Sequence, residues 1–124
     1  MQLIIDLDGT ICTEEKTFER ALAKPKNGAI EAVNQLFDDG HIVIIYTARS
    51  WSEYRLTEDW LKQHGLRYSQ LVMGKPIGDL WIDDRAIEFK SWENTLTRIK
   101  AKQQNDTANE CASDHRRSRN QPWR

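Results

Sequence analysis

Six residues of the sequence carry side chains that together could handle a phosphate group and a divalent cation. Four are carboxylates, one is a hydroxyl and one is an ammonium group, and most follow directly after a short apolar run. They are Asp6, Asp8, Asp83, Asp84, Thr47 and Lys75. Apolar runs of this kind predict buried strands of a parallel sheet, and ligands of such sheets bind beyond the carboxyl ends of the strands. The pattern therefore predicts one shared crevice.

The aspartate pair after the first apolar run favours a hard cation. Asp6 and Asp8 are two residues apart, so in extended chain their side chains point to the same side. Gly9 lets the backbone turn sharply after them. Converging carboxylates repel unless a cation lies between them, and Mg²⁺ prefers oxygen ligands together with substrate phosphate. Histidines and cysteines at metal-ligand spacing are lacking, which argues against Zn²⁺.

Phosphoryl transfer would give each of these side chains a role. One aspartate can attack phosphorus, and a second can protonate the leaving oxygen and then activate water. Lys75 and the Thr47 hydroxyl can offset and hold the phosphoryl charge. Because this reaction depends mostly on positioning and electrostatics, such a short set of groups is sufficient.

Alternating apolar runs and amphipathic segments predict the elements that position these residues. Strands are expected at Leu3–Asp6, Ile42–Tyr46, about Gln70–Met73 and Leu80–Ile82. Helices are expected from the N-cap Asn27, from the capping box Ser50–Glu53 and from Ser91. The fold class is α/β, a single Rossmann-like three-layer sandwich around a central parallel sheet.

Composition divides the chain into one domain and a tail. Residues 1–100 are expected to form the catalytic domain, and residues 101–124, which are polar and end in a basic stretch, a disordered tail. The formal net charge of −1 makes nucleic acid an unfavourable partner. No apolar run approaches the roughly 20 residues that span a bilayer, so no membrane contact is expected. Cys12 and Cys111, far apart, predict free thiols in a reducing cytoplasm.

Four motifs in order resemble those of the haloacid dehalogenase (HAD) superfamily, over about residues 3–90. Leu3–Ile11, with Asp6-Leu7-Asp8-Gly9-Thr10, resembles the first motif and Thr47 the second. Lys75 in Gly74-Lys75-Pro76 resembles the third, and Asp83-Asp84 the fourth.

The resemblance implies a role for each residue. Asp6 is similar to the family nucleophile and a Mg²⁺ ligand, and Asp8 to the general acid/base, whose backbone carbonyl also contacts the metal. Thr47 and Lys75 resemble the phosphoryl-holding pair. Asp83 resembles the direct carboxylate ligand, and Asp84 is expected to act through water. An aspartate at position 8 implies phosphate rather than haloacid substrates.

The intervals between the motifs leave no room for the cap domain that many HAD enzymes carry. Capless members act on large substrates or close the site with a neighbouring subunit, so a homo-oligomer or a macromolecular substrate is expected. More narrowly, Tyr46–Arg49 and Trp81–Ala86 resemble small phosphatases of surface-polysaccharide synthesis. This resemblance implies a sugar phosphate or related metabolite as substrate.

Several alternatives remain open at this point. Arg49 and Arg85 could bind an anionic group of the substrate, pair with the acidic cluster or lie in solvent. The chain could pass the phosphoryl group to an acceptor other than water, as a phosphotransferase or mutase. It could also be a non-catalytic phosphate-binding or receiver-like signalling module. Receivers, however, place the acidic pair first and the lysine last.

Overall fold

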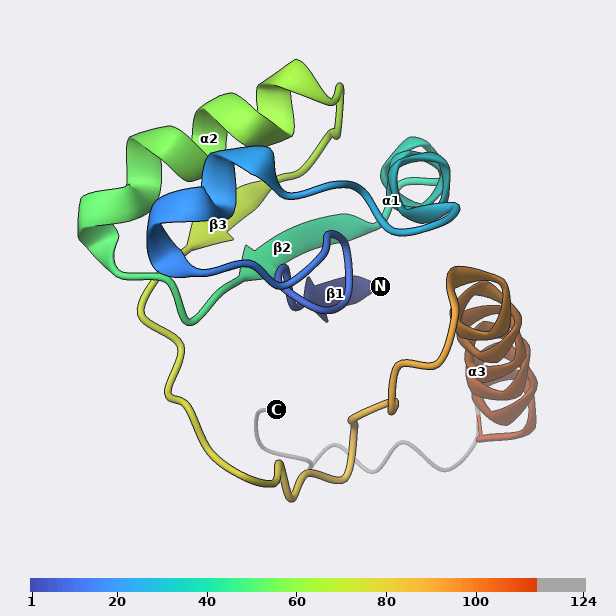
Figure 1. Ribbon diagram of the computed structural model, residues 1–124. Helices are drawn as coiled ribbons and strands as arrows, with labels where there is room; N and C mark the ends of the chain where they lie inside the picture. The colour runs from blue at the N-terminus through green and yellow to red at the C-terminus, as the bar shows by residue number, and fades with distance from the viewer. Residues whose placement is uncertain (114–124) are drawn as a thin grey trace.

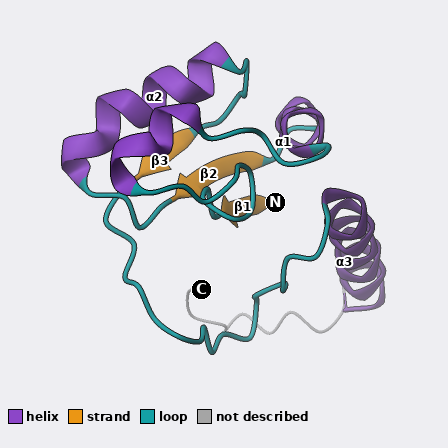
Figure 2. Ribbon diagram, viewed as in Figure 1, coloured by secondary structure: helices purple, strands orange, loops and turns teal. Residues whose placement is uncertain are grey.

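A three-stranded parallel sheet forms the centre of the computed structural model, which describes residues 1–113 (Figure 1). The elements in chain order are β1 (Gln2–Ile5), η1 (Thr17–Leu22), α1 (Ala29–Asp38), β2 (Ile42–Tyr46), η2 (Trp51–Glu53), α2 (Tyr54–Gln63), β3 (Gln70–Val72) and α3 (Trp92–Ser113). The η elements are single 3₁₀ turns or short runs of them. Figure 2 shows that helical and strand segments alternate up to β3.

The strands pair in the order β1-β2-β3, and both pairs are parallel. Leu3 lies opposite Val43, and Ile45 lies opposite Leu71. Parallel pairing requires a crossover between consecutive strands, and α1 and α2 provide these crossovers. The predicted α/β class and the first three predicted strands are confirmed.

Apolar side chains on one face of the sheet form the core. Val43 and Ile45 of β2 are fully buried there, together with Val33 of α1 and Leu61 of α2. On the opposite face Ile4 and Ile42 are 64% and 50% exposed. Helices α1 and α2 lie on the same side of the sheet (Figure 1), so the three-layer arrangement stays a prediction.

Local hydrogen bonds set the starts of the helices. The predicted capping box at Ser50 and Glu53 is formed, and Ser91 Oγ accepts the Asn94 N–H at 3.1 Å at the start of α3. The prediction of Asn27 as N-cap is wrong by one residue. Gly28 occupies that position with φ of +74°, a left-handed conformation that favours glycine.

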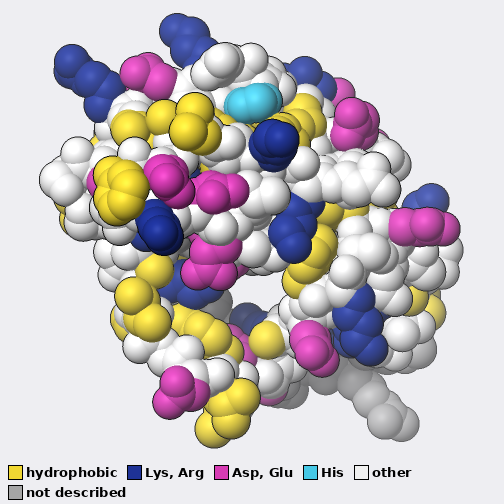
Figure 3. Space-filling model, in the orientation of Figure 1, with side chains coloured by type: hydrophobic (Ala, Val, Ile, Leu, Met, Phe, Trp, Pro, Cys, Tyr) yellow, Lys and Arg dark blue, Asp and Glu magenta, His cyan; other side chains and the backbone are white. Residues whose placement is uncertain are grey.

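The fourth predicted strand, Leu80–Ile82, does not form. These residues belong to an exposed connection without regular structure, 76–88, which we call the arm. The arm leaves the body of the molecule after β3 and returns to it before α3 (Figure 1), and Figure 3 shows a gap between it and the rest of the molecule. Apolar residues form a strand only against a neighbouring strand or packed surface, and within residues 1–113 the segment has neither.

Helix α3 extends through Ser113, beyond the predicted domain boundary at residue 100. Residues 101–113 are therefore helical in the structure, and residues 114–124 of the predicted tail lie outside the described part. The division into a domain and a tail stays a prediction. Within residues 1–113, each helix is too short or too polar to cross a membrane.

Candidate active site

Three of the predicted site residues come together where the parallel strands end. Asp6 follows β1, Thr47 follows β2, and Lys75 comes shortly after β3. Lys75 Nζ lies 3.2 Å from Asp6 Oδ1, and the Lys75 N–H donates to Thr47 O at 2.9 Å. The parallel topology thus brings an ammonium group and a carboxylate into contact across the width of the sheet.

The turn after β1 separates the two aspartates and anchors them. Leu7 between them is fully buried, and its carbonyl accepts the N–H groups of Thr10, Ile11 and Cys12 at 2.8 to 3.2 Å. This turn is possible because Gly9 adopts a φ of +84°. Asp6 Oδ2 in turn accepts a long hydrogen bond of 3.4 Å from Thr10 Oγ1. Asp6 is therefore partly exposed, next to a turn that backbone hydrogen bonds hold in place.

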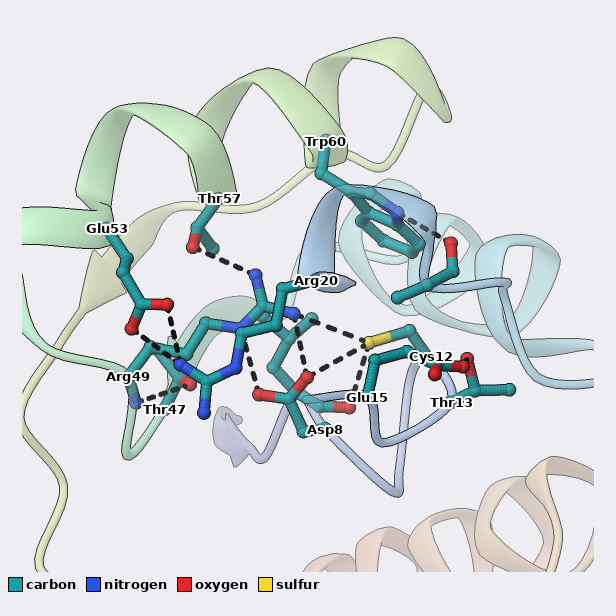
Figure 4. A network of polar contacts seen from close by, with 12 residues as sticks. Asp8, Cys12, Thr13, Glu15, Arg20, Thr47, Arg49, Glu53, Thr57 and Trp60 are labelled. Atoms are coloured by element: carbon teal, nitrogen blue, oxygen red, sulfur yellow. Dashed lines mark hydrogen bonds and ion pairs between the residues drawn. The ribbon is translucent and has the colours of Figure 1, made fainter. Parts of the chain in front are cut away.

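Asp8 is held by a buried arginine (Figure 4). Arg49 Nε donates to Asp8 Oδ2 at 2.9 Å, and Nη2 donates to Asp8 Oδ1 at 2.7 Å. Nη1 donates to the buried hydroxyl of Thr57 at 3.0 Å. The Arg49 side chain is fully enclosed, whereas the Asp8 side chain is 18% exposed. The two charges form a bidentate pair, the geometry in which arginine binds carboxylates most strongly.

The pair of Arg49 and Asp8 affects the pKa of Arg49 itself and that of the neighbouring thiol of Cys12. Burial lowers the pKa of Arg49, but the hydrogen bonds and the charge of Asp8 outweigh it and leave the pKa raised. Cys12 Sγ lies 3.6 Å from Asp8 Oδ1, and burial together with the Asp8 charge raises the pKa of this thiol to about 12. Cys12 is therefore a neutral thiol at ordinary pH and a poor nucleophile.

A second ion pair fastens η1 beside the site. Arg20 Nη1 donates to both carboxylate oxygens of Glu53, at 2.7 and 2.5 Å (Figure 4). Glu53 also closes the capping box of η2, since its Oε2 accepts the Ser50 N–H at 3.2 Å. Trp60 Nε1 donates to Ala23 O at 2.8 Å just after η1. The segment between β1 and α1 is thus packed on α2, close to Asp8.

Thr47 lies deeper than the two charged groups. It is fully buried, and its Oγ1 accepts the Arg49 N–H at 3.2 Å. Lys75 Nζ lies 5.9 Å from the ring centroid of Tyr46 and 5.1 Å from that of Trp81, distances at which a cation interacts with an aromatic face. Trp81 belongs to the arm, so the arm begins near the site.

The acidic pair of the predicted fourth motif is not part of this cluster. Asp83 and Asp84 are exposed on the arm, where Asp83 Oδ1 accepts the Arg85 N–H at 2.9 Å. Asp84 Oδ1 is 4.0 Å from Arg85 Nε, and both side chains are largely exposed. Within residues 1–113, no three carboxylate, imidazole or thiol groups lie close enough to hold a metal ion. In this arrangement Asp83 and Asp84 stand apart from Asp6 and Asp8, so the four carboxylates do not form one cation site.

Sequence reasoning left the role of Arg49 open among three alternatives, and the structure shows the one in which it pairs with an acidic residue. A signal was present, because Arg49 follows Thr47 by two residues as Asp8 follows Asp6, and the two pairs come after the adjacent strands β2 and β1. Cys12 was expected near the crevice from its place after the first motif, whereas nothing in the sequence indicated that Thr57 would join this network.

A groove of about 500 Å³ lies apart from these residues, between α1 and the start of α3. Its lining includes Glu31, Phe89 and Trp92, and none of the predicted site residues borders it. The strand ends therefore remain the candidate active site, since they combine an exposed carboxylate with a neighbouring cation.

Comparison with known proteins identifies solved structures of similar fold. No protein-family model matches the sequence, and no curated protein matches it. A Vibrio cholerae protein described as structural-genomics target APC26283 has a TM-score of 0.62 and 24% identity, over 82% of this chain and 98% of the other.

A chain of the Pnkp1/Rnl/Hen1 complex has a TM-score of 0.52 and 20% identity, over 67% of this chain and 31% of that one. A D,D-heptose 1,7-bisphosphate phosphatase from B. bronchiseptica, solved with magnesium and phosphate, has a TM-score of 0.49 and 18% identity. That match covers 81% of this chain and 63% of the phosphatase. At these identities the first two likenesses show that the chain shares an α/β fold with solved proteins.

Proposed function

We propose that this chain hydrolyses phosphomonoesters, with Asp6 as nucleophile and Asp8 as general acid and base. The observation that carries the proposal is the contact between Asp6 and Lys75. A carboxylate that is 36% exposed lies 3.2 Å from an ammonium group at the carboxyl ends of parallel strands. Ligands of open α/β sheets bind at this edge.

In the first step an oxygen of Asp6 attacks phosphorus. A bond forms between this oxygen and phosphorus, the ester bond breaks, and the leaving oxygen takes a proton from protonated Asp8. Water then attacks phosphorus of the aspartyl-phosphate and gives a proton to Asp8. The bond between the Asp6 oxygen and phosphorus breaks, which releases phosphate and regenerates the Asp6 carboxylate. The short interval between the aspartates supports this division of roles, because the buried Leu7 anchors both.

The bidentate contact with Arg49 leaves lone-pair sites open on both oxygens of Asp8. A carboxylate has about four lone-pair sites, and the two hydrogen bonds from Arg49 occupy one on each oxygen. The remaining sites can take part in proton transfer while the bidentate contact fixes the plane of the carboxylate. Arg49 is in this sense a positioning residue.

Charge balance gives Lys75 its role. The attacking carboxylate and the phosphoryl group are both anionic, so a fixed cation beside them lowers the cost of their approach. Lys75 contacts Asp6 directly and is held through its backbone by Thr47. The Thr47 hydroxyl would hold a phosphoryl oxygen after a small opening, since the residue is buried in this arrangement.

Mg²⁺ enters the proposal through the motif resemblance to HAD phosphatases. When bound, the ion would supply additional positive charge to the phosphoryl group. Asp83 and Asp84 are its remaining proposed ligands, and they have to leave their exposed positions on the arm before they can contact it. The same resemblance supports a sugar phosphate or related metabolite as substrate.

A receiver-like signalling role is less favoured than hydrolysis. A phosphorylated aspartate that transmits a signal has to persist, whereas an acid/base two residues away would speed its hydrolysis. Phosphotransfer to another acceptor is less favoured because the nucleophile stands at the open surface.

The decisive experiment measures phosphate release from a panel of phosphorylated sugars, nucleotides and other metabolites, with and without Mg²⁺. The wild type is compared with Asp6→Asn and with Asp39→Asn. Asp39 is a matched control because it is an exposed aspartate at the opposite, amino-terminal ends of the strands.

We expect Mg²⁺-dependent release by the wild type and by Asp39→Asn, and a loss of at least about 10³-fold in Asp6→Asn, as befits the loss of a nucleophile. A trapped phosphoryl group on the Asp8→Asn variant, seen as an added mass, would support the covalent intermediate. Equal rates for the wild type and Asp6→Asn would refute the proposal.

A further inference from the structure

Trp51 is a large aromatic side chain that stays open to solvent directly beside the candidate active site. It is 61% exposed and begins η2, four residues after Thr47. A single exposed apolar residue is normal on a protein surface, so its surroundings decide whether it can serve a ligand. Aromatic side chains that border a few polar reacting groups are typical of small-molecule sites.

Hydrogen bonds hold the turn that carries Trp51. The Ser50 N–H donates to Glu53 Oε2 at 3.2 Å, and the Glu53 N–H donates to Ser50 O at 2.9 Å. Glu53 is in turn fixed by its ion pair with Arg20. Trp51 is therefore exposed on a preorganised turn, so that little ordering of the backbone is needed when a ligand binds there.

Two neighbours fix the orientation of the indole ring. Tyr54 stacks on it, with ring centroids 5.9 Å apart and an angle of 17° between the planes. The pyrrole edge lies against Gly74, where a Cβ would be 3.4 Å from Trp51 Nε1 and 3.7 Å from Cδ1. Because one face is stacked on Tyr54 and the residue is largely exposed, the second face of the ring is open to solvent.

The open face lies next to the groups that would hold the phosphoryl group. Gly74 directly precedes Lys75, and consecutive Cα atoms are about 3.8 Å apart. The Gly74 N–H donates to Arg49 O and the Lys75 N–H to Thr47 O, each at 2.9 Å, so the segment that leads to Trp51 is tied to the segment of Lys75. Figure 1 shows the chain passing from β2 to α2 at the edge where the strands end. The leaving group of a phosphomonoester held at Lys75 is therefore within reach of Trp51.

We propose that the open face of Trp51 binds a ring of the leaving group, so that the preferred substrates carry the phosphoryl group on or close to a ring. This inference rests on the proposed function, because it assigns the leaving group of that reaction. The face of an indole ring is electron-rich and attracts the C–H groups of a sugar ring, and nucleobases stack on it as well. The chemistry that both share is a ring with a flat apolar face.

The first test compares substrates with and without a ring, since Trp51 should serve only those with one. Initial rates are measured for glucose 6-phosphate, adenosine 5′-monophosphate and glycerol 2-phosphate. We expect Trp51→Ala to lower kcat/KM by about 5- to 100-fold for at least one ringed substrate, mostly through KM, because the ring is bound equally in the ground and transition states. Trp51→Phe keeps an aromatic face and should retain most of kcat/KM. The value for glycerol 2-phosphate should change less than about twofold in both variants.

Ile42→Ala is the matched control. Ile42 is 50% exposed, but it lies at the amino-terminal end of β2, away from the strand ends that form the site. This variant should match the wild type on all three substrates. A loss in Trp51→Ala that is confined to glucose 6-phosphate or to adenosine 5′-monophosphate tells which ring is bound. Equal losses on ringed and ringless substrates overturn the proposal, because they would show that Trp51 only supports the site.

The second test needs no turnover. Calorimetry measures the binding of the same three compounds to Asp6→Asn, which lacks the proposed nucleophile. Adding Trp51→Ala to this variant should weaken binding of the preferred ringed compound by the same factor as kcat/KM, and adding Ile42→Ala should not. If neither ringed compound binds more tightly than glycerol 2-phosphate, the proposal is overturned. If the wild type releases no phosphate from any substrate, the proposed function fails, while calorimetry still decides whether Trp51 binds a ring.

Discussion

The ion pair between Arg49 and Asp8 should be worth more to stability than any other pair of charges described here. The informative substitutions are Arg49→Met, which keeps the bulk and removes the charge, and Asp8→Asn. Both groups are held by two hydrogen bonds to one another, but Arg49 is fully enclosed and Asp8 is partly open to water. The two single variants should therefore not be equally costly.

Breaking a buried pair by removing one partner costs roughly 3–5 kcal/mol. In Asp8→Asn the stranded guanidinium has no access to solvent, so the loss should lie near the upper end, at about 4–5 kcal/mol. In Arg49→Met water can still reach the carboxylate, so the loss should be about 3 kcal/mol, including the lost bond to Thr57. The double variant leaves no stranded charge and should cost about 2 kcal/mol less than the sum of the two.

The assay is urea unfolding followed by tryptophan fluorescence, at one fixed protein concentration so that any association affects all variants alike. Arg67→Met provides a matched control. Arg67 also forms a bidentate pair, at 3.2 and 2.6 Å from Asp38, but both partners are about half exposed. Its removal should cost under about 1 kcal/mol.

Two results would refute the reasoning. If Arg49→Met costs no more than Arg67→Met, burial does not strengthen the pair. If the costs of Arg49→Met and Asp8→Asn add within about 0.5 kcal/mol in the double variant, the two side chains act independently of one another.

Three further outcomes are expected. Burial, with a nearby carboxylate, raises the pKa of Cys12 from 9.0 to about 12, so only the unfolded chain ionises this thiol between those values. The free energy of unfolding should accordingly fall with rising pH there, by up to about 1.4 kcal/mol per pH unit more than in Cys12→Ala, in urea titrations. Gly74→Ala should lower stability by about 1–2 kcal/mol in thermal melts, because the φ of +78° is a left-handed conformation that side chains with a Cβ rarely adopt. Trp60→Phe removes the 2.8 Å bond to Ala23 O and should cost about 1–3 kcal/mol in the same melts, whereas no change would show that water replaces the donor.

Much of the fold follows from signals that act over a few residues. The capping box of Ser50 and Glu53 is a local arrangement of two side chains and two N–H groups, and it forms where the sequence predicts it. The apolar run of β2 likewise becomes a strand, because two other strands pair with its edges and the helices α1 and α2 bury one of its faces. Parallel topology then predicts that Asp6, Thr47 and Lys75 meet at one edge, as they do.

Features that depend on residues far apart in the sequence could not be predicted in the same way. Arg49 is buried through its contacts with Asp8, which is 41 positions away in the sequence, and with Thr57, which is 8 positions away. Its residue type alone predicted an exposed side chain as readily as a paired one. The N-cap of α1 is a smaller case. Gly28 takes this position instead of the predicted Asn27, because the backbone there is left-handed, and the capping chemistry of the side chain does not decide it.

The run Leu80–Ile82 shows the limit most clearly. Its residues have strand-forming character as pronounced as that of β1, yet a strand is defined by its neighbour, and in the described part of one chain this neighbour is lacking. The apolar run and the acidic pair behind it are adjacent in sequence, so whatever pairs with the run also determines where Asp83 and Asp84 lie. Mg²⁺ binding, measured by calorimetry, should therefore be weakened in Ile82→Asp, although that substitution alters no proposed ligand. Unchanged Mg²⁺ binding in this variant would mean that the acidic pair reaches Asp6 by a route that does not require the apolar run.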